Sequence, residues 1–274
     1  MNIDDYNNSY LEKVKDYLEN NNRFITKDLV ERTMMEGLDE EDAVCALLSS
    51  IMNLDIVETE YYLKYGLKEL DKELYTNNPY YQNIVINDKT HNNIHLTYEE
   101  YKPYELFVCD DFIKVDGRVI PQLGYFTSEF KYPCIKESDN IWMLITPNEV
   151  NTMKSAIDNS YGRVITFGLG LGYYAYMVSN KEEVKSLTII ENNKDIIDLF
   201  KEEILPQFPN KEKINIINAD AYEFSKNMDG YDYCFIDIYH DVSDGIDDYI
   251  YFKLRENKNI KYDYWIEKTI KCYF

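Results

Sequence analysis

Residues 163–172 have the sequence Arg-Val-Ile-Thr-Phe-Gly-Leu-Gly-Leu-Gly, an apolar run followed by three glycines at alternate positions. A second apolar segment, Tyr173 to Val178, comes directly after them. This order predicts a strand, a turn and a helix, and glycine lets a ligand approach the backbone closely at the helix N-terminus. The spacing differs from the G-x-G-x-x-G of dinucleotide sites, because Tyr173 stands where the third glycine would be.

Each of the next three apolar runs leads into an acidic residue. The runs are 187–190, 214–217 and 233–236, and the acids are Glu191, Asp220 within Asn218-Ala219-Asp220-Ala221, and Asp237. Helical spacing separates the runs, so the pattern predicts an α/β fold with a doubly wound parallel sheet. In such a sheet ligands bind at the carboxyl ends of the strands, where we expect these acids to meet.

Residues 163–239 resemble the cofactor half of the class I S-adenosylmethionine-dependent methyltransferases. The resemblance rests on the order of the G-x-G-x-G loop, the first acid, the Asp-Ala pair and the fourth-strand acid. It implies a Rossmann-like domain with S-adenosylmethionine as cofactor. By this similarity the glycines pass beneath the methionine moiety of the cofactor; they are Gly168, Gly170 and Gly172. The resemblance also implies that Glu191 binds the ribose and that Asp220 binds the adenine amino group, with Ala221 alongside. Asp237 would face the methionine end and the acceptor. Asp220 is also a suitable N-cap for a helix after it, and the two roles are compatible.

The hairpin pattern ahead of the capped helix and the Tyr-Asp-x-x-x-x-Asp string at 231–237 are similar in part to the spermidine synthases, and the chain continues from Asp237 as Ile238-Tyr239-His240-Asp241. Those aminopropyltransferases carry a D-[ST]-[ST]-D signature whose second Asp deprotonates the attacking amine. His240 occupies that position here. Since imidazole titrates near neutral pH, His240 and Asp237 are the candidate catalytic residues; a surface histidine is the alternative for His240.

The segment after Asp237 has only 37 residues, 274 minus 237. We expect this length to be too short for the remaining strands of a seven-stranded sheet, so the sheet either is truncated at its C-terminal edge or takes strands from elsewhere. Tyr262–Phe274, with Trp265, Ile266 and Ile270, is interpreted as a final helix.

Upstream of the glycine loop, Thr146-Pro147-Asn148-Glu149 is typical of a capped helix start, with Thr146 as N-cap and Glu149 completing a capping box. Apolar runs between Tyr104 and Ile145, broken by Asp-Gly and Pro-Gln, predict β-hairpins. Residues 1–75 carry helical periodicity, and 76–100 are interpreted as a connector. We therefore divide the chain into a helical N-terminal region with connector (1–100), a small β-hairpin region (101–145) and the Rossmann-like S-adenosylmethionine-binding domain (146–274).

His91 and His95 could share a helical face and bind a metal, but their surroundings are Asn-rich and lack a further ligand at suitable spacing. We therefore predict no metal site. Helices near Thr26–Met35 and Asp42–Met52 could form a helix-turn-helix, yet the region is acidic where a DNA-reading helix is basic. A docking or homodimerising role is our hypothesis for this region.

The composition is strongly acidic, with 29 Lys and Arg against 50 Asp and Glu, a formal charge of −21. Residues 1–160 carry a charge of −15 and residues 161–274 a charge of −6. This charge argues against a nucleic-acid partner. A solvated surface is the ordinary explanation of such a charge, and attraction of a basic small-molecule acceptor is the alternative. The chain shows neither a signal-peptide pattern at its start nor an apolar run long enough to span a membrane. Its five cysteines form no C-x-x-C pair, which is typical of buried thiols in a reducing compartment. We therefore expect a cytoplasmic protein without membrane contact.

The sequence thus predicts an S-adenosylmethionine-dependent methyltransferase that acts on a small, basic molecule. Two alternatives remain open: a spermidine synthase-like aminopropyltransferase, and a cofactor-binding protein that has lost catalysis. The acceptor, the oligomeric state and the role of the N-terminal helices do not follow from the residues.

Overall fold

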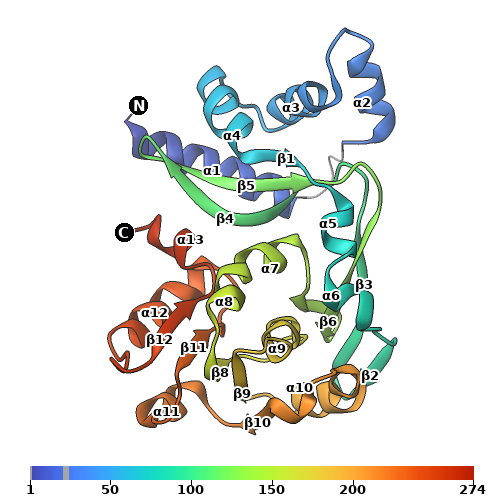
Figure 1. Cartoon of the computed structure of the whole chain (residues 1–274). Helices are drawn as coiled ribbons and strands as arrows, with labels where there is room; N and C mark the ends of the chain where they lie inside the picture. Colours follow the sequence, from blue (N-terminus) through green and yellow to red (C-terminus); the bar gives the residue numbers. More distant parts are fainter. Residues whose placement is uncertain (1, 21–24) are drawn as a thin grey trace. The chain divides into compact units, whose positions relative to one another are not determined.

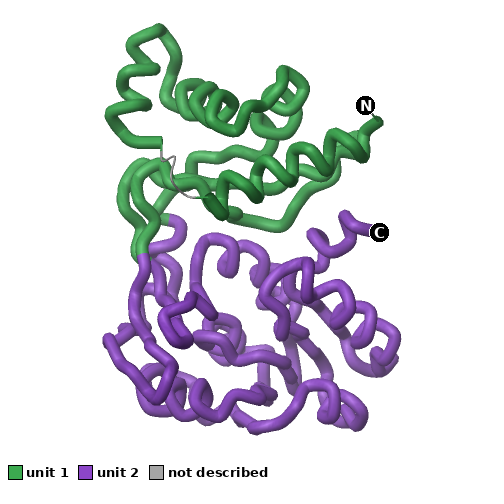
Figure 2. Tube along the Cα trace, turned by 180° about the vertical axis from the view of Figure 1, so that it is seen from behind, with its two compact units in different colours: residues 1–73, 100–131 green, residues 74–99, 132–274 purple. Residues whose placement is uncertain are grey.

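A computed structural model of the chain describes residues 2–20 and 25–274 (Figure 1). They form two compact units, unit 1 (Met1–Glu73 and Glu100–Lys131) and unit 2 (Leu74–Glu99 and Tyr132–Phe274), shown in Figure 2. Each unit combines segments that are not consecutive in sequence, so the units do not coincide with the divisions 1–100, 101–145 and 146–274. The predicted helical region includes Met1 and residues 21–24, which lie outside the described residues.

Unit 1 contains the predicted N-terminal helices and a three-stranded sheet in the order β1-β5-β4. Its elements are α1 (Ile3–Glu19), α2 (Lys27–Met34), α3 (Glu40–Ile51), the π-helix η1 (Glu58–Leu63), α4 (Lys64–Gly66), β1 (Leu67–Glu69), β4 (Phe107–Val115) and β5 (Arg118–Tyr125). The side chains of Asn2, Thr26 and Asp39 cap α1, α2 and α3, which supplies acceptors for backbone N–H groups that lack a partner at helix starts. The unit has its own core, which includes the fully buried rings of Tyr10 and Tyr62.

Residues 76–100, expected to form a connector, are largely ordered into regular structure, so that prediction was wrong. They contain the end of α5 (Lys72–Thr76), α6 (Pro79–Asn83), β2 (Lys89–His91) and most of β3 (Ile94–Tyr101). Asn78 caps α6 and Pro79 occupies its first position, a start signal that the Asn-rich composition obscured. The predicted hairpins did form, but they belong to two sheets: β4 and β5 pair in one, whereas β6 (Phe130–Glu137) and β7 (Asn140–Leu144) pair in the four-stranded sheet β2-β3-β6-β7.

Unit 2 contains the predicted Rossmann-like fold, a parallel sheet of five strands in the order β10-β9-β8-β11-β12 (Figure 1). The strands are β8 (Gly162–Phe167), β9 (Val184–Glu191), β10 (Ile214–Asn218), β11 (Tyr233–Ile236) and β12 (Lys261–Tyr264). The helical segments are α7 (Pro147–Thr152), α8 (Lys154–Asn159), α9 (Tyr173–Ser179), α10 (Lys194–Leu199), η2 (Phe200–Ile204), η3 (Leu205–Gln207), η4 (Lys211–Lys213), α11 (Ala221–Phe224), η5 (Ser225–Asn227), α12 (Val242–Lys253) and α13 (Glu267–Lys271). The chain adds β9 and β10 on one side of β8 and then β11 and β12 on the other side. At such a reversal, the switch point of the sheet, a crevice forms at the carboxyl ends of the strands, here beside the glycine loop.

The C-terminal prediction was wrong in part, because Tyr262–Phe274 is not one helix. A fifth strand, β12, pairs with β11 and matches Cys234 with Tyr262 and Ile236 with Tyr264. A helix, α13, follows only at Glu267, after Ile266 adopts a left-handed conformation with φ of 43°. Pairing with a distant strand outweighs local helical spacing here, since tertiary contacts override propensity.

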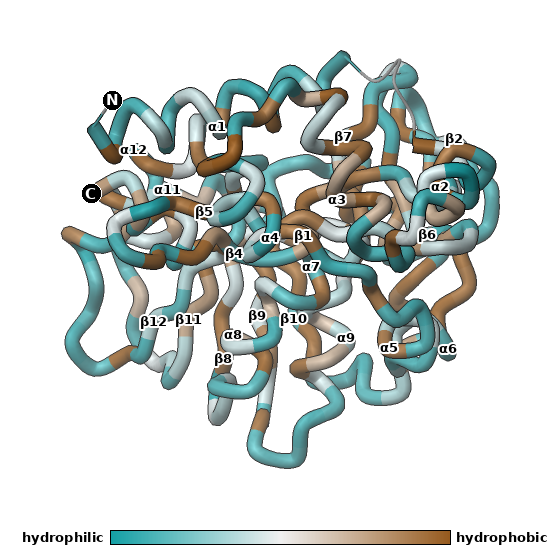
Figure 3. Tube along the Cα trace, turned by 90° about the horizontal axis from the view of Figure 1, so that it is seen from above, coloured by the Kyte–Doolittle hydropathy of each residue, from teal (hydrophilic) through white to brown (hydrophobic). Residues whose placement is uncertain are grey.

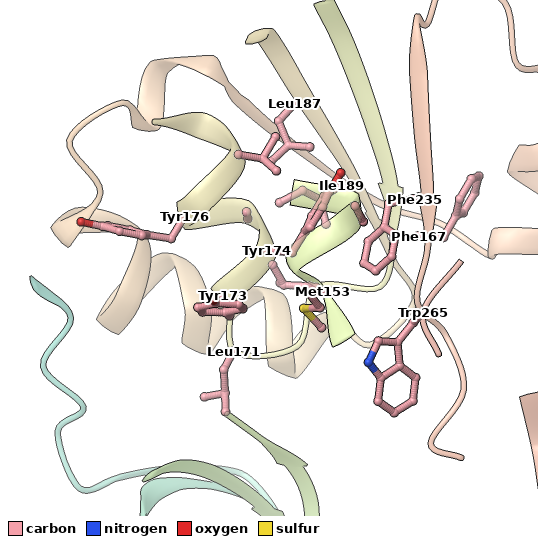
Figure 4. Packing of buried hydrophobic residues seen from close by; sticks show 14 of the residues in the cluster. Met153, Phe167, Leu171, Tyr173, Tyr174, Tyr176, Leu187, Ile189, Phe235 and Trp265 are labelled. Carbon is pink, nitrogen blue, oxygen red and sulfur yellow. The ribbon is translucent and has the colours of Figure 1, made fainter. Parts of the chain in front are cut away.

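The core of unit 2 is built on this sheet. Val164, Ile165 and Phe167 of β8 and all of β11 are fully buried. The loops at the bottom of the view in Figure 3 are mostly hydrophilic, with a few hydrophobic positions. The Tyr174 ring stacks on Phe235 with centroids 4.4 Å apart, and both belong to the cluster in Figure 4. The strands of a parallel sheet covered on both faces are expected to be continuously apolar.

None of the helices within residues 2–20 and 25–274 combines the length and the apolar composition that a membrane span requires. His91 and His95 lie on the two paired strands of the β2-β3 hairpin, not on a helix, and contact different carboxylates, Asp195 and Asp88. Among the described residues no group of three or more His, Cys, Asp or Glu side chains could hold a metal ion.

Candidate functional site

A cavity of about 400 Å³ lies at the carboxyl ends of β8, β9 and β11 in unit 2. It brings together all the site residues predicted from the sequence, namely Gly168, Gly170, Gly172, Glu191, Asp220, Ala221, Asp237 and His240. This is the edge of the sheet at which doubly wound folds bind ligands. The proximity of these residues is a feature of the structure; their roles toward a ligand remain predictions.

The three glycines of the loop have positive φ angles, but only one leaves open space for a ligand. A Cβ atom on Gly168 would lie 1.9 Å from the carbonyl oxygen of Asp237, and one on Gly172 would lie 2.3 Å from the Phe200 ring. At Gly170 the nearest atom is the Met143 sulfur, 3.9 Å away. Gly168 and Gly172 therefore serve packing, and Gly170 is the position where a ligand can approach the backbone.

Glu191 lies at the end of β9 with only 7% of its surface exposed. Its two carboxylate oxygens accept hydrogen bonds from the backbone N–H groups of Leu169, at 3.2 Å, and Asn193, at 2.7 Å. Burial raises the pKa of Glu191, and the backbone donors oppose that rise. The carboxylate is thus held in one orientation, and each oxygen keeps a lone pair for a ligand hydroxyl.

Asp220 caps α11, because its Oδ1 accepts a hydrogen bond of 2.9 Å from the backbone N–H of Glu223. The structural role considered for this residue is therefore real. Asp220 and Ala221 also line the cavity, so the cap and the predicted adenine contact are compatible.

Asp237 follows β11 and borders the cavity. None of the described residues donates a hydrogen bond to its carboxyl group or forms an ion pair with it. Burial, together with the negative charge of Glu191, raises the pKa of Asp237 to about 7. A carboxyl group that titrates near neutral pH can hold or accept a proton under physiological conditions.

His240 lies at the rim of the cavity, with 63% of its side chain exposed. Its Nδ1 atom is 3.1 Å from Oδ2 of Asp244, whose carboxylate also accepts hydrogen bonds from the backbone at the start of α12. This contact orients the ring and leaves Nε2 free to face solvent or a ligand. His240 is therefore both a surface residue and a cavity residue, and the two interpretations made from the sequence are compatible.

Glu149 is a cavity residue that the sequence analysis missed. The capping box predicted for it does not form, because the Thr146 side chain makes no cap hydrogen bond. The helix also breaks at Met153, giving the short segments α7 and α8. Glu149 instead lines the cavity, and burial and then the negative charge of Asp237 raise its pKa well above the usual value. A carboxylate in the helix that precedes the glycine strand was the available signal.

The cavity wall is acidic and aromatic. Among the described residues that line it there are five carboxyl groups, one histidine and no lysine or arginine. The acids are Glu149, Glu191, Asp220, Asp237 and Asp248, and the aromatic residues are Trp142, Tyr173, Tyr174, Tyr222, Tyr239 and Trp265. Carboxylates and aromatic faces both attract cations. The wall therefore favours a ligand that carries positive charge.

No family model matches the chain, and no curated protein matches it. Among solved structures, the chain is similar to a Klebsiella pneumoniae protein assigned as an O-methyltransferase (16% identity, TM-score 0.28, covering 35% of this chain and 44% of that one). It is also similar to spermidine synthase from Thermotoga maritima (14%, 0.33, 49% and 53%) and to precorrin 8w decarboxylase from Methanobacterium thermoautotrophicum (13%, 0.34, 44% and 63%). This chain therefore spans less than two thirds of the length of each. A likeness at these identities and TM-scores assigns no activity to this chain.

Proposed function

We propose that the chain is an S-adenosylmethionine-dependent methyltransferase whose acceptor is a small, basic molecule. The observation that carries the proposal is the acidic cavity at the switch point, where the open backbone at Gly170 and the fixed carboxylate of Glu191 line the same space. The residues present fit the cofactor, because a carboxylate accepts ribose hydroxyls and acidic walls suit a sulfonium and an ammonium.

In this proposal Glu191 binds the ribose, and Asp220 with Ala221 contacts the adenine. The cofactor supplies an electrophilic carbon attached to a sulfonium. The protein aligns the acceptor with that carbon, and such positioning can contribute ~7–11 kcal/mol. Asp237 is the preferred proton acceptor because it lies within the cavity, whereas His240 is at its rim.

Calorimetry tests the cofactor assignment. The native chain should bind S-adenosylmethionine and S-adenosylhomocysteine, and Glu191→Ala should weaken both by at least about tenfold through loss of a buried, charged hydrogen-bond acceptor. Glu182→Gln changes an exposed acid outside the cavity and serves as control. Failure of the native chain to bind either nucleoside contradicts the proposal.

Aminopropyl transfer is a second candidate, and one observation favours it. No described residue of the cavity wall is a lysine or arginine that could neutralise the α-carboxylate of S-adenosylmethionine. A decarboxylated sulfonium lacks that carboxylate and needs no such partner. The product mass after incubation with an amine and each cofactor distinguishes the two reactions: a gained methyl group excludes aminopropyl transfer, and a gained aminopropyl group excludes methyl transfer.

A further inference from the structure

Two of the five cavity acids have no polar partner among the described residues. Glu191 is held by backbone N–H groups, Asp220 caps α11, and Asp248 accepts a hydrogen bond from the Tyr222 hydroxyl. Glu149 and Asp237 have no such contact, although they are close enough for the charge of Asp237 to act on Glu149. Both side chains are partly open to the cavity that they line. Carboxyl groups that line an acidic cavity with neither a hydrogen-bond donor nor a cation beside them favour a positively charged ligand.

We infer that Glu149 and Asp237 form a cation subsite that holds one proton when empty and exchanges this proton for a positively charged group of the ligand. The inference rests on the proposed function, since it specifies the charge of the group that the same cavity takes. It assigns to Glu149 a role as a specificity-determining residue.

Two neighbouring carboxyl groups with low solvent access cannot both be ionised at low cost, so one of them keeps a proton at a pH where an exposed acid has lost it. The directions of the shifts agree: burial and the charge of Asp237 raise the pKa of Glu149, and burial and the charge of Glu191 raise the pKa of Asp237. A cation that enters removes the repulsion, and one proton then leaves to solvent.

The other groups that face this pair do not supply the missing positive charge. Tyr173 and Tyr174 of α9 and Tyr239 after β11 are neutral phenols. Their hydroxyls contact Asn78, Ser160 and the carbonyl of Trp265, respectively. The remaining charged groups of the wall are acids, apart from His240 at the rim, which contacts Asp244. The cation must therefore come with the ligand.

The wall around the pair strengthens this selection. Met153 lies one helical turn after Glu149, and it lines the cavity together with the rings of Tyr173 and Trp265, which Figure 4 shows in the same cluster. Aromatic and thioether surfaces exclude water, which makes charge interactions stronger, and ring faces attract cations. A sulfonium or an ammonium fits this environment better than a neutral group of the same size.

Proton release measured by calorimetry tests the inference. The native chain is titrated in two buffers of different ionisation enthalpy, with S-adenosylmethionine, with S-adenosylhomocysteine, and with propylamine after saturation with S-adenosylhomocysteine. Release of a substantial fraction of about one proton near neutral pH is expected with at least one of the three ligands. S-adenosylhomocysteine has the α-ammonium of S-adenosylmethionine but not its sulfonium. Release with S-adenosylmethionine alone therefore assigns the sulfonium to the pair, release with both nucleosides assigns their α-ammonium, and release with propylamine assigns the acceptor ammonium.

Glu149→Gln keeps the side-chain shape and should abolish the proton release. Where the sulfonium or the acceptor ammonium occupies the pair, this variant should change S-adenosylhomocysteine binding by less than about threefold. Asp237→Asn should also abolish the proton release and covers the case in which Glu149→Gln does not fold; Glu182→Gln is again the control. Binding of both nucleosides without proton release, or release that persists in both variants, overturns this inference and leaves the proposed function intact. Absence of any nucleoside binding overturns both.

Discussion

Glu58 of unit 1 and the acids Glu149 and Asp237 of unit 2 have contrasting surroundings. In unit 1, Glu58 is 1% exposed, and its Oε2 accepts from Lys13 Nζ at 2.5 Å and from the backbone of Asp55 at 2.8 Å, while its Oε1 accepts from Ser9 at 3.2 Å. In unit 2, Glu149 and Asp237 border a cavity without a described partner. Removing the partner of a buried, ionised acid is costly, and an unpaired acid beside a cavity costs free energy that a ligand can recover.

Among the substitutions in these two groups of acids, Asp237→Asn should have the largest effect on catalytic activity. Loss of a positioned proton acceptor should lower turnover of an amine acceptor by roughly 10²–10⁴-fold. Product formation followed by mass spectrometry measures the change, and thermal unfolding checks that the variant is folded. Turnover equal to that of the native chain would remove Asp237 from the mechanism.

Glu58→Gln should have the largest effect on stability. The substitution removes the charge that pairs with Lys13, whose side chain is 29% exposed. Because one partner of an interior ion pair is left behind, we expect the free energy of unfolding to fall by about 2–4 kcal/mol. Urea denaturation of the native chain and the variant measures the difference; a loss below about 0.5 kcal/mol would show that the pair is energetically equivalent to a surface pair.

Glu149→Gln should change stability in the opposite direction, and only at higher pH. The folded-state pKa of Asp237 is raised from 3.8 to about 7, and that of Glu149 is also raised. Below the unfolded pKa both states are protonated and the full stability is present; it is lost as the pH rises through the folded pKa, because ionisation is costly only in the folded state. The variant should therefore be more stable than the native chain by about 1 kcal/mol at pH about 8, with no gain near pH about 4. Urea titrations across this range measure the slope, and a stabilisation independent of pH would contradict the explanation.

His240→Ala should have the smallest effect. The ring is mostly exposed and its pairing with Asp244 is an exposed contact, so we expect a change in stability below about 0.5 kcal/mol. Turnover should fall less than about tenfold, because Asp237 remains as proton acceptor. The same product assay compares the two variants, and a loss for His240→Ala that exceeds the loss for Asp237→Asn would reverse the assigned order of the two residues.

The sequence predicted the part of the site that depends on strand ends. Glu191, Asp220 and Asp237 each follow an apolar run, and parallel strands bring their carboxyl ends to one edge, so local order was sufficient to place them together. The distinct tasks of the glycines were not predictable in this way, because the contacts of Gly168 and Gly172 are with residues 69 and 28 positions away, Asp237 and Phe200.

Glu149 and the C-terminal segment could not be placed for the same physical reason. The capping-box pattern at Thr146 describes only local hydrogen bonds, whereas the direction of the Glu149 side chain depends on where the helix packs against the strand ends. Likewise, Tyr262 and Tyr264 become strand residues through pairing with β11. The start of α6 is different, because Asn78 and Pro79 carried a local signal that was available and not used.

The carbonyl oxygen of Asp237 fills the space where any side chain at position 168 would begin. The glycine loop and the residue expected to accept the proton thus pack backbone against backbone, and a side chain at position 168 would displace one of them. Anyone who redesigns this protein for new acceptors should vary the α7 wall around Glu149, since changes in the glycine loop would also displace the acid opposite.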